Sequence, residues 1–546
     1  MLDVIHADST ADEAYNGKTL TERLTGRFYT PDALAEQLAR SILAAIDRRH
    51  VSNALKVTDP FCGDGRLVEA LLREAAKCDN LRRLAWHIEL RDRDEAAAQM
   101  AAIRVTNAAA TIGISAKVDV RVGDTFEGSL NPRFDVVITN PPWELLKPDV
   151  RELSHMSEVG AANYKHRLRA ASDRLDRTFP EAVGVNAWGG WSTNLARCGW
   201  SLSMQICRPG GVIGIVLPAT ILADQSSERI RRFVFEDNSL AEAAVFPAEA
   251  RLFERVDQPV AALTIVRAER PSGDARLLLY GNQRMLLSTI ALDVSPGSLA
   301  ARGWSLSVGF GATAGRVLSR LDGLSTLGEL EKSPDSGLWL GRELDETRIT
   351  EKTAPGIAMP FVKGRMVGRH RIVSQPTTSV LPAVGSRFVS SKFPRFVWRD
   401  VSRASQKRRM IGTVIPAGWV AGNSLHVGCF RDGDMSKTVA LHAVLSSFVL
   451  ELQVRSRLST GHMSLGVVRQ SRIPSFKAQS IKRLAAAGRR ALGSSEEGWA
   501  SDALEVAVAR EYGLDRSSMI AILEHFPKID DDERERIAQV KAWQTA

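Results

Sequence analysis

Short apolar runs alternate with helix-like segments along the first half of the chain. The alanine-rich stretch Asp94–Ala110, together with Leu67–Ala76 and Leu195–Cys207, predicts helices. The runs between these segments predict strands at Leu55–Asp59, Leu84–Leu90, Val118–Val122, Phe134–Thr139, Gly211–Leu217, Ala241–Val245 and Val260–Val266. Short apolar strands separated by helices are typical of a largely parallel sheet that is covered on both faces. The pattern therefore predicts an α/β fold.

A polar stretch between Lys147 and Gly190 interrupts this alternation. Its arginines and glycines predict an irregular insertion on the C-terminal edge of the sheet, and long irregular segments of this kind are usually functional or disordered. After about residue 300, β-branched and aromatic runs broken by Pro and Gly indicate a smaller domain of mixed or β type. Beyond Lys477, apolar residues at three- and four-residue spacing predict helices. We predict domains at 1–300, 301–477 and 478–546.

Composition places the chain among globular proteins. Of the 546 residues, 44% are hydrophobic and 25% are charged, which is the usual mixture for a soluble fold. Residues Met1–Gly17 have no apolar signal-peptide core, and the apolar stretch Val212–Ala223 is too short to cross a bilayer. Five scattered cysteines without C-x-x-C spacing predict neither a disulfide framework nor a zinc module. These features favour a bacterial-type cytoplasmic protein without a metal centre.

Positive charge is concentrated in one part of the chain. The formal net charge is +9, but residues 361–477 contain 19 Lys and Arg against 4 Asp and Glu, a net of +15. A block of one sign predicts a polyanionic partner, nucleic acid first. Basicity for solubility alone and an anionic membrane surface are the alternatives.

Asn140-Pro141-Pro142-Trp143 directly follows the predicted strand Phe134–Thr139. The side-chain carbonyl of Asn140 and the backbone carbonyl of Pro141 can accept the two hydrogens of an exocyclic amino group. This pulls the nitrogen toward tetrahedral geometry and frees its lone pair for attack on a methyl group. The prolines rigidify the loop, and Trp143 offers a flat face for stacking an extruded base. Alternatively, the tetrapeptide is a turn that ends a strand.

About 80 residues earlier, Asp59-Pro60-Phe61-Cys62-Gly63-Asp64-Gly65 also ends a predicted strand and opens a helix. The two glycines allow the backbone to approach a ligand closely, and Asp59 can hold an ammonium group. The segment matches neither the dinucleotide fingerprint nor a phosphate loop.

Two further acids follow the next predicted strands. Asp92 can accept from both ribose hydroxyls, with Glu89 as the alternative, and Asp124 can accept from an adenine amino group. Each acid by itself is more often a helix cap or a surface residue.

The chain resembles the γ-class adenine-N6 DNA methyltransferases of bacterial restriction–modification systems. The resemblance rests on three segments in this order: Gly26–Pro31 (G-R-F-Y-T-P), D-P-F-C-G-D-G and N-P-P-W. The resemblance implies a Rossmann-like sheet that binds S-adenosylmethionine. It implies catalytic roles for Asn140, Pro141, Pro142, Trp143 and Phe253, with Phe246 as the competitor of Phe253. It implies cofactor binding by Tyr29, Thr30, Asp59, Pro60, Gly63, Gly65, Asp92, Asp124 and Asn140.

The basic region is similar to the target-recognition domains attached to such enzymes. The resemblance implies a basic, mixed α/β domain that binds double-stranded DNA. We select its candidate DNA-binding residues from segments that look like those domains: Arg365, Arg369, Arg409, Asn423 and His462. For each of them a phosphate contact or a structural role competes with base readout.

The sequence thus predicts site-specific transfer of a methyl group to N6 of a flipped adenine in duplex DNA. RNA or a protein glutamine as substrate, and a non-catalytic DNA-specificity subunit, are the alternatives. Neither a nuclease pattern nor a Walker A loop is recognisable, so a separate restriction endonuclease as partner, or none, is the expectation. A palindromic site would favour a homodimer, and DNA binding would associate the protein with the nucleoid.

Overall fold

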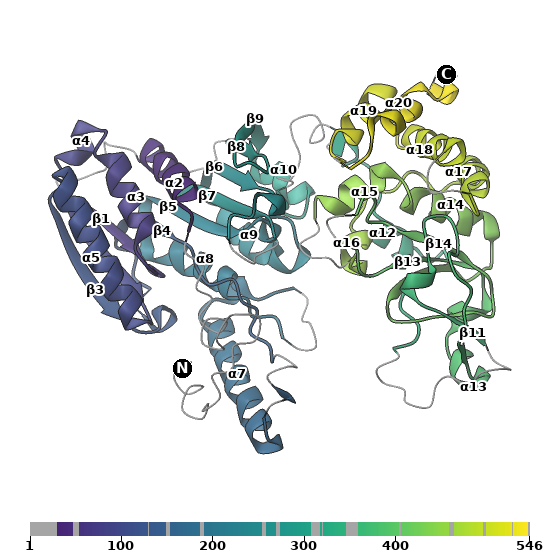
Figure 1. The fold of residues 1–546 in the computed structure, drawn as a ribbon, viewed down its shortest axis with the longest axis horizontal. Coiled ribbons are helices and arrows are strands. Elements are labelled where there is room, and N and C mark those ends of the chain that lie inside the picture. The colour runs from purple at the N-terminus through teal and green to yellow at the C-terminus, as the bar shows by residue number, and fades with distance from the viewer. Residues whose placement is uncertain are drawn as a thin grey trace. The chain divides into compact units, whose positions relative to one another are not determined.

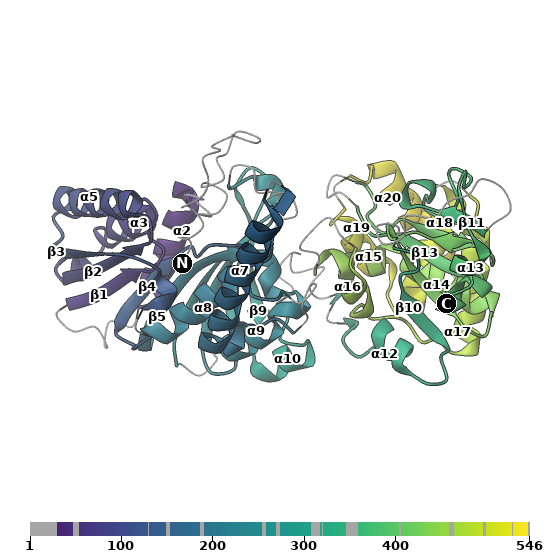
Figure 2. The ribbon, with the colours of Figure 1, turned by 90° about the horizontal axis from the view of Figure 1, so that it is seen from below.

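The computed structural model divides the chain into two compact units, residues 1–309 and 310–546, and each is described by itself (Figures 1 and 2). The structure describes residues 30–46, 54–128, 130–148, 153–154, 156–185, 191–253, 258–268, 273–306, 317–318, 320–345, 359–402, 406–457, 463–494, 498–526 and 528–543. The predicted Tyr29 and His462 lie outside these ranges.

Unit 1 is built on a nine-stranded sheet with the order β3-β2-β1-β4-β5-β7-β6-β8-β9. The pairs from β3 to β5 and the pair β6–β8 are parallel, whereas β7 and β9 run antiparallel to their neighbours. The largely parallel sheet is therefore confirmed. Its strands are β1 (Ala54–Asp59), β2 (Ala85–Asp92), β3 (Ala116–Val122), β4 (Phe134–Thr139), β5 (Cys207–Pro218), β6 (Ser239–Phe246), β7 (Val260–Val266), β8 (Asp274–Tyr280) and β9 (Leu286–Asp293).

Helices cover both faces of this sheet (Figure 2). Along β4, Val136 and Ile138 join one hydrophobic core, and Phe134 and Val137 join the other, because successive side chains point to opposite faces. Trp143 borders both cores. The helices of unit 1 are α2 (Asp32–Ala45), α3 (Arg66–Ala75), α4 (Asp79–Arg82), α5 (Glu95–Ile112), α7 (Glu158–Thr178), α8 (Leu195–Ile206), α9 (Glu228–Phe235) and α10 (Pro296–Ala301).

Helix α7 corrects the prediction of an irregular insertion between residues 147 and 190. It is 21 residues long and extends away from the sheet (Figure 1). Ser157 caps its first turn by accepting a hydrogen bond from the backbone N–H of Gly160. A narrow stripe is buried, formed by Tyr164, Leu168, Ala171, Ser172 and Leu175. Because the rest of the helix is polar, its periodicity is weak in the sequence.

Unit 2 combines two small sheets with a helical layer. Strands β10 (Leu338–Gly341), β16 (Leu425–Phe430), β13 (Arg395–Arg399) and β14 (Gly412–Ile415) form an antiparallel sheet in that order. Strand β11 pairs with β12 and β15 in the second sheet, whose members are β11 (Met359–Val362), β12 (Ser379–Val380) and β15 (Val420–Ala421). This arrangement confirms the predicted mixed α/β region.

The C-terminal helices share one core with the four-stranded sheet. Phe396 and Trp398 of β13 belong to the same cluster as Leu484, Leu504 and Ile522 of the helical region, whose presence is confirmed. The helices of unit 2 are α12 (Leu327–Lys332), α13 (Pro382–Gly385), α14 (Met435–Leu445), α15 (Phe448–Arg455), α16 (Leu465–Arg469), α17 (Ala478–Ala491), α18 (Trp499–Glu511), α19 (Arg516–Leu523) and α20 (Asp531–Gln539). Among the described residues, no single helix has the length and hydropathy of a membrane span; α14 and α15 reach them only as a pair bent by 58°.

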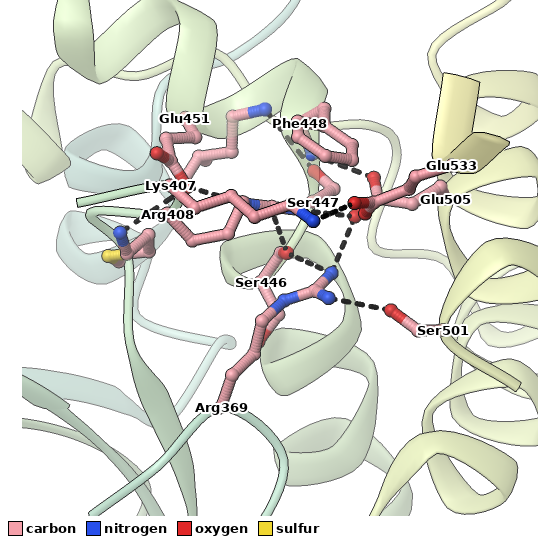
Figure 3. A network of polar contacts seen from close by, with 12 residues as sticks. Arg369, Lys407, Arg408, Ser446, Ser447, Phe448, Glu451, Ser501, Glu505 and Glu533 are labelled. Atoms are coloured by element: carbon pink, nitrogen blue, oxygen red, sulfur yellow. Dashed lines mark hydrogen bonds and ion pairs between the residues drawn. The ribbon is translucent and has the colours of Figure 1, made fainter. Parts of the chain in front are cut away.

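A buried ion-pair network joins these helices to the loop segments that carry Arg369 and Arg408 (Figure 3). Glu505 of α18 accepts hydrogen bonds from Arg369 at 2.6 Å and from Arg408 at 3.0 Å. Arg408 also donates to Glu451 of α15 at 2.9 Å. Both guanidinium groups donate to the carbonyl of Ser446, which caps the C-terminus of α14 and carries the negative end of its dipole.

This network corrects the DNA-binding prediction for Arg369. Its side chain is 2% exposed and its charge is neutralised inside the core, so it cannot reach a phosphate. The prediction from sequence could not anticipate this because Glu505 lies 136 residues away.

Glu505→Gln tests the weight of the network. The substitution leaves two buried guanidinium groups with one counter-charge fewer, so we expect the free energy of unfolding to fall by about 3 kcal/mol or more. Denaturant titration followed by tryptophan fluorescence measures it. Asp531→Asn is the control, since Asp531 pairs with Arg534 while 90% exposed and should contribute less than about 1 kcal/mol. Equal effects of the two substitutions would contradict this role of Glu505.

Candidate active site

Three parallel neighbours, β2, β1 and β4, end at one edge of the sheet of unit 1. Asp59 is the last residue of β1, Asp92 is the last residue of β2, and Asn140 directly follows β4. The pairing Thr58↔Val137 holds the ends of β1 and β4 level. In an open α/β sheet, ligands bind in the crevice at this carboxyl edge.

Asp59 is fully buried at this edge. Its Oδ1 accepts hydrogen bonds from Thr139 Oγ1 at 2.7 Å and from the backbone N–H of Phe61 at 3.1 Å. Its Oδ2 is buried and has no hydrogen-bond partner among the described residues. Burial raises the pKa of Asp59 to about 7, against these two hydrogen bonds, which lower it. A buried oxygen of this kind fits a cationic ligand group such as an ammonium.

The loop after β1 is shaped by its glycines. Gly63 and Gly65 adopt φ values of 51° and 82°, which favour glycine. A Cβ atom on Gly65 would lie 2.9 Å from the Cα of Ala101 in α5, so only glycine lets the start of α3 approach that helix. The N–H of Gly63 donates to Asp92 Oδ2 at 3.0 Å, which ties the loop to the end of β2.

Glu89, the alternative to Asp92, has another role. Its carboxylate accepts from Arg91 and Arg133 and pairs with Arg121 at 3.1 Å. These three arginines compensate its charge, so the structure favours Asp92 over Glu89 for a ligand contact at the loop.

Asp124 caps the 3-10 helix Thr125–Glu127 by accepting from the N–H of Phe126 at 3.1 Å. Its Oδ2 lies 3.4 Å from Nη2 of Arg174, which projects from α7 and also pairs with Glu127. Sequence reasoning did not identify Arg174, because the segment that carries it was expected to be irregular.

Asn140 contacts a residue 110 positions earlier. Its Nδ2 donates to Oγ1 of the buried Thr30 at 3.3 Å, immediately before α2. The structure thus brings together Thr30, Asp59 and Asn140, with Thr139 joining the last two.

The Pro141 ring packs against Gly199 of α8. A Cβ atom on Gly199 would lie 2.4 Å from Pro141 Cβ and 3.3 Å from Phe61 Cε2. The N-P-P-W loop and the glycine loop therefore meet at one position of α8, where any larger residue would displace them.

Trp143 and Phe253 meet edge to face, with ring centroids 5.2 Å apart and an interplanar angle of 81°. The competing Phe246 instead stacks on Tyr280, with centroids 4.1 Å apart. Of the two phenylalanines, the structure therefore places Phe253 beside the N-P-P-W loop.

The predicted DNA-binding residues of unit 2 have different environments. Arg365 is exposed in the 3-10 helix Gly364–Met366. Arg409 is half-buried and donates to Ser402, and Asn423 donates to Asp345 at 3.3 Å. Across the described part of the chain, there is no group of three or more His, Cys, Asp or Glu side chains that could hold a metal ion.

Comparison with known proteins agrees with this arrangement. Residues 17–166 match the family model described as N-6 DNA Methylase. The Type II methyltransferase M.BanIII of Aneurinibacillus aneurinilyticus is 22% identical over 232 residues, which cover 41% of this chain and 35% of that protein. The match therefore spans about a third of the length of that relative.

Two solved structures can be aligned with this chain, and only the first reaches a TM-score above 0.5. The Type IIL restriction-modification enzyme MmeI, in complex with DNA, aligns with 93% of this chain and 75% of its own at 10% identity and a TM-score of 0.53. A Listeria monocytogenes protein described as a class I S-adenosylmethionine-dependent methyltransferase aligns with 49% of this chain and 68% of its own, at 16% identity and a TM-score of 0.33. The family match thus lies within residues 17–166, which contain the Asp59 and Asn140 segments of the candidate site, and the M.BanIII relative is similar to this chain at low identity.

Proposed function

We propose that the protein transfers a methyl group from S-adenosylmethionine to N6 of an adenine flipped out of duplex DNA at a specific site, as a γ-class enzyme. The meeting of Thr30, Asp59 and Asn140 at the carboxyl edge of β1 and β4 carries this proposal. It joins an acid that fits an ammonium group to an amide that fits an exocyclic amine. The family match over residues 17–166 supports the same reading.

The residues proposed to hold the cofactor are Asp59, the glycine loop, Asp92 and Asp124. The buried Oδ2 of Asp59 would accept from the methionine ammonium, and Thr30 would contact the carboxylate. Asp92 would take the ribose hydroxyls and Asp124 the adenine amino group. When bound, S-adenosylmethionine supplies an electrophilic methyl group on a sulfonium sulfur.

Asn140 and Pro141 would act on the target base. The amide oxygen of Asn140 and the carbonyl of Pro141 accept the two amino hydrogens, which localises the lone pair on N6. Held in this way, N6 would take up the methyl group that the cofactor supplies, the thioether would be released, and the amino proton would leave to solvent. Trp143 and Phe253, which already contact each other, would receive the flipped base and offset the few kcal/mol that flipping costs.

Asn140→Ala tests the chemistry. We expect adenine methylation to be abolished while duplex DNA binding changes by less than about twofold, because the proposed contact of Asn140 with DNA is confined to the reacting amine. Base-modification sequencing of DNA from expressing cells, with binding measured on the purified chain, checks both. Loss of DNA binding in step with methylation would show that Asn140 is structural. Preferential methylation of structured RNA over duplex DNA in competition would overturn the proposed substrate.

The raised pKa of Asp59 predicts that cofactor binding depends on pH. Below pH 7 the buried carboxyl is protonated in the ligand-free protein, and an ammonium ligand must displace that proton. The affinity for S-adenosylmethionine should therefore fall as the pH drops from 8 to 6, approaching about tenfold per unit below 7.

Calorimetric titration across this pH range measures the effect. Asp59→Asn should bind more weakly and without this slope, while the exposed Asp119→Asn on β3 should retain the slope. An equal slope in Asp59→Asn would assign it to another titrating group and contradict this role of Asp59, because the ligand's own amino group would give the opposite sign.

Gly199→Ala should slow methyl transfer by about 100-fold, because the new Cβ displaces Pro141 and, with it, Asn140. Single-turnover transfer of a labelled methyl group measures this rate. Gly297→Ala in α10 is the matched control, since a Cβ there meets nothing within 4 Å. An unchanged rate in Gly199→Ala would show that catalysis tolerates movement of the loop.

A further inference from the structure

Three polar residues meet where β10 and β13 end and β16 begins. Arg342 directly follows β10, Asp400 directly follows β13, and His426 is the second residue of β16. Strand pairing brings these positions together, because Gly341 pairs with Val427 and Trp398 pairs with His426.

The cluster holds one guanidinium group in a defined orientation. Arg342 Nη2 lies 2.9 Å from Asp400 Oδ1, which His426 Nε2 contacts at 2.8 Å. Arg342 Nε lies 3.4 Å from His426 Nδ1, and its Nη2 lies 3.5 Å from Nε2, so the guanidinium lies along the imidazole ring. Burial lowers the pKa of His426, against the hydrogen bond with Asp400, which raises it. A neutral ring with a proton on Nε2 can therefore donate to Asp400.

Arg342 is much more exposed than the two residues that hold it, Asp400 and His426. The side chains of Asp400 and His426 are 9% and 2% exposed, whereas that of Arg342 is 42% exposed. Among the described residues, Nη1 of Arg342 has no hydrogen-bond partner. The buried pair thus presents an outer edge of N–H donors to the surroundings.

A neighbouring ion pair, formed by the next residue in the sequence, Glu343, with Arg395, shows how an arginine with a purely structural role is bonded here. Glu343 and Arg395 are both fully buried, and Arg395 donates to Glu343 through Nε and Nη2 and to the carbonyls of Phe393, Pro416 and Trp419. All of its nitrogens have partners. Arg342 contrasts with this pattern, because its supports are buried and its outer donors are not used.

Two residues selected from the sequence lie at the same end of the sheet. Ser424 links them to the cluster: its Oγ accepts from the N–H of Gly364 at 2.9 Å, and its carbonyl accepts from the N–H of Asp400 at 2.9 Å. The exposed Arg365 follows Gly364, and Asn423 precedes Ser424. Arg342 therefore belongs to a polar surface that already contains candidate DNA contacts.

We propose that Arg342 reads a guanine of the target site, with Asp400 and His426 as its positioning residues. The proposal rests on duplex DNA as the substrate. A guanidinium edge donates two parallel hydrogen bonds to O6 and N7 of guanine in the major groove. Fixing the guanidinium before DNA arrives reduces the entropy lost on binding, and the fork geometry, which lysine lacks, gives the specificity.

The test is selection of bound duplexes from a randomised DNA pool by the full chain, without cofactor, followed by sequencing. Wild type should select a motif that contains guanine at a fixed position. Arg342→Ala and Arg342→Lys should lose the preference for that one base pair by about tenfold or more, while the other positions stay selected. Asp400→Asn should relax the same position, because it loosens the guanidinium.

Arg431→Ala is the matched control, since Arg431 is exposed beside the opposite end of β16. This variant should select the same DNA motif as wild type. Uniformly weaker binding with an unchanged motif in Arg342→Ala would identify a phosphate contact and overturn the proposal, as would a wild type that selects no motif. If Arg342→Ala melts at a lower temperature than wild type, its loss of selectivity could come from partial unfolding, and the result for Arg342→Lys then decides between the outcomes. Because selection needs no turnover, a chain that selects a motif yet methylates nothing refutes the catalytic proposal alone.

Discussion

Parallel pairing of β1 with both β2 and β4 is the constraint on which the candidate site depends. It sets the ends of three strands at one edge, so that Asp59, Asp92 and Asn140 gather although 81 residues separate the first from the last. The hydrogen bond from Thr139 to Asp59 then joins the acid to the loop, and Gly199 holds that loop against α8. The position of Asn140 thus follows from backbone pairing first and from side-chain packing second.

The sequence predicted the elements of this edge well, because buried strands combine apolar runs with clear boundaries. The predictions Phe134–Thr139 and Val260–Val266 agree residue for residue with β4 and β7. Strands β8 and β9 were missed. Strand β9 is an edge strand with exposed alternate residues, which weakens its apolar signal. Helix α7 was missed because its buried stripe is narrow, and Arg174 was missed with it.

The arginines of unit 2 show that a count of charged residues in the sequence does not predict which charges lie on the surface. The sequence indicated a basic region. In the structure, however, three of its arginines form buried ion pairs with glutamates: Arg369, Arg395 and Arg408 with Glu343, Glu451 and Glu505. Two of these acids lie outside the basic segment 361–477, so a window count overstates its surface charge. Conversely, Arg342 lies outside that segment and was not selected, because its partners are 58 and 84 residues away. Pairing across the sheet decides which arginine is interior and which is presented.

The single core that unites the four-stranded sheet with the C-terminal helices also bears on how such a protein can diversify. Since Phe396 and Trp398 share their cluster with Leu484, Leu504 and Ile522, recombination between two homologous genes at residue 477 would combine halves of two different interiors. A crossover near residue 310 would instead exchange an intact folding unit together with its surface arginines. Under the proposed function, a new DNA specificity would therefore be inherited with the whole of residues 310–546, while residues 1–309 and their candidate site are kept.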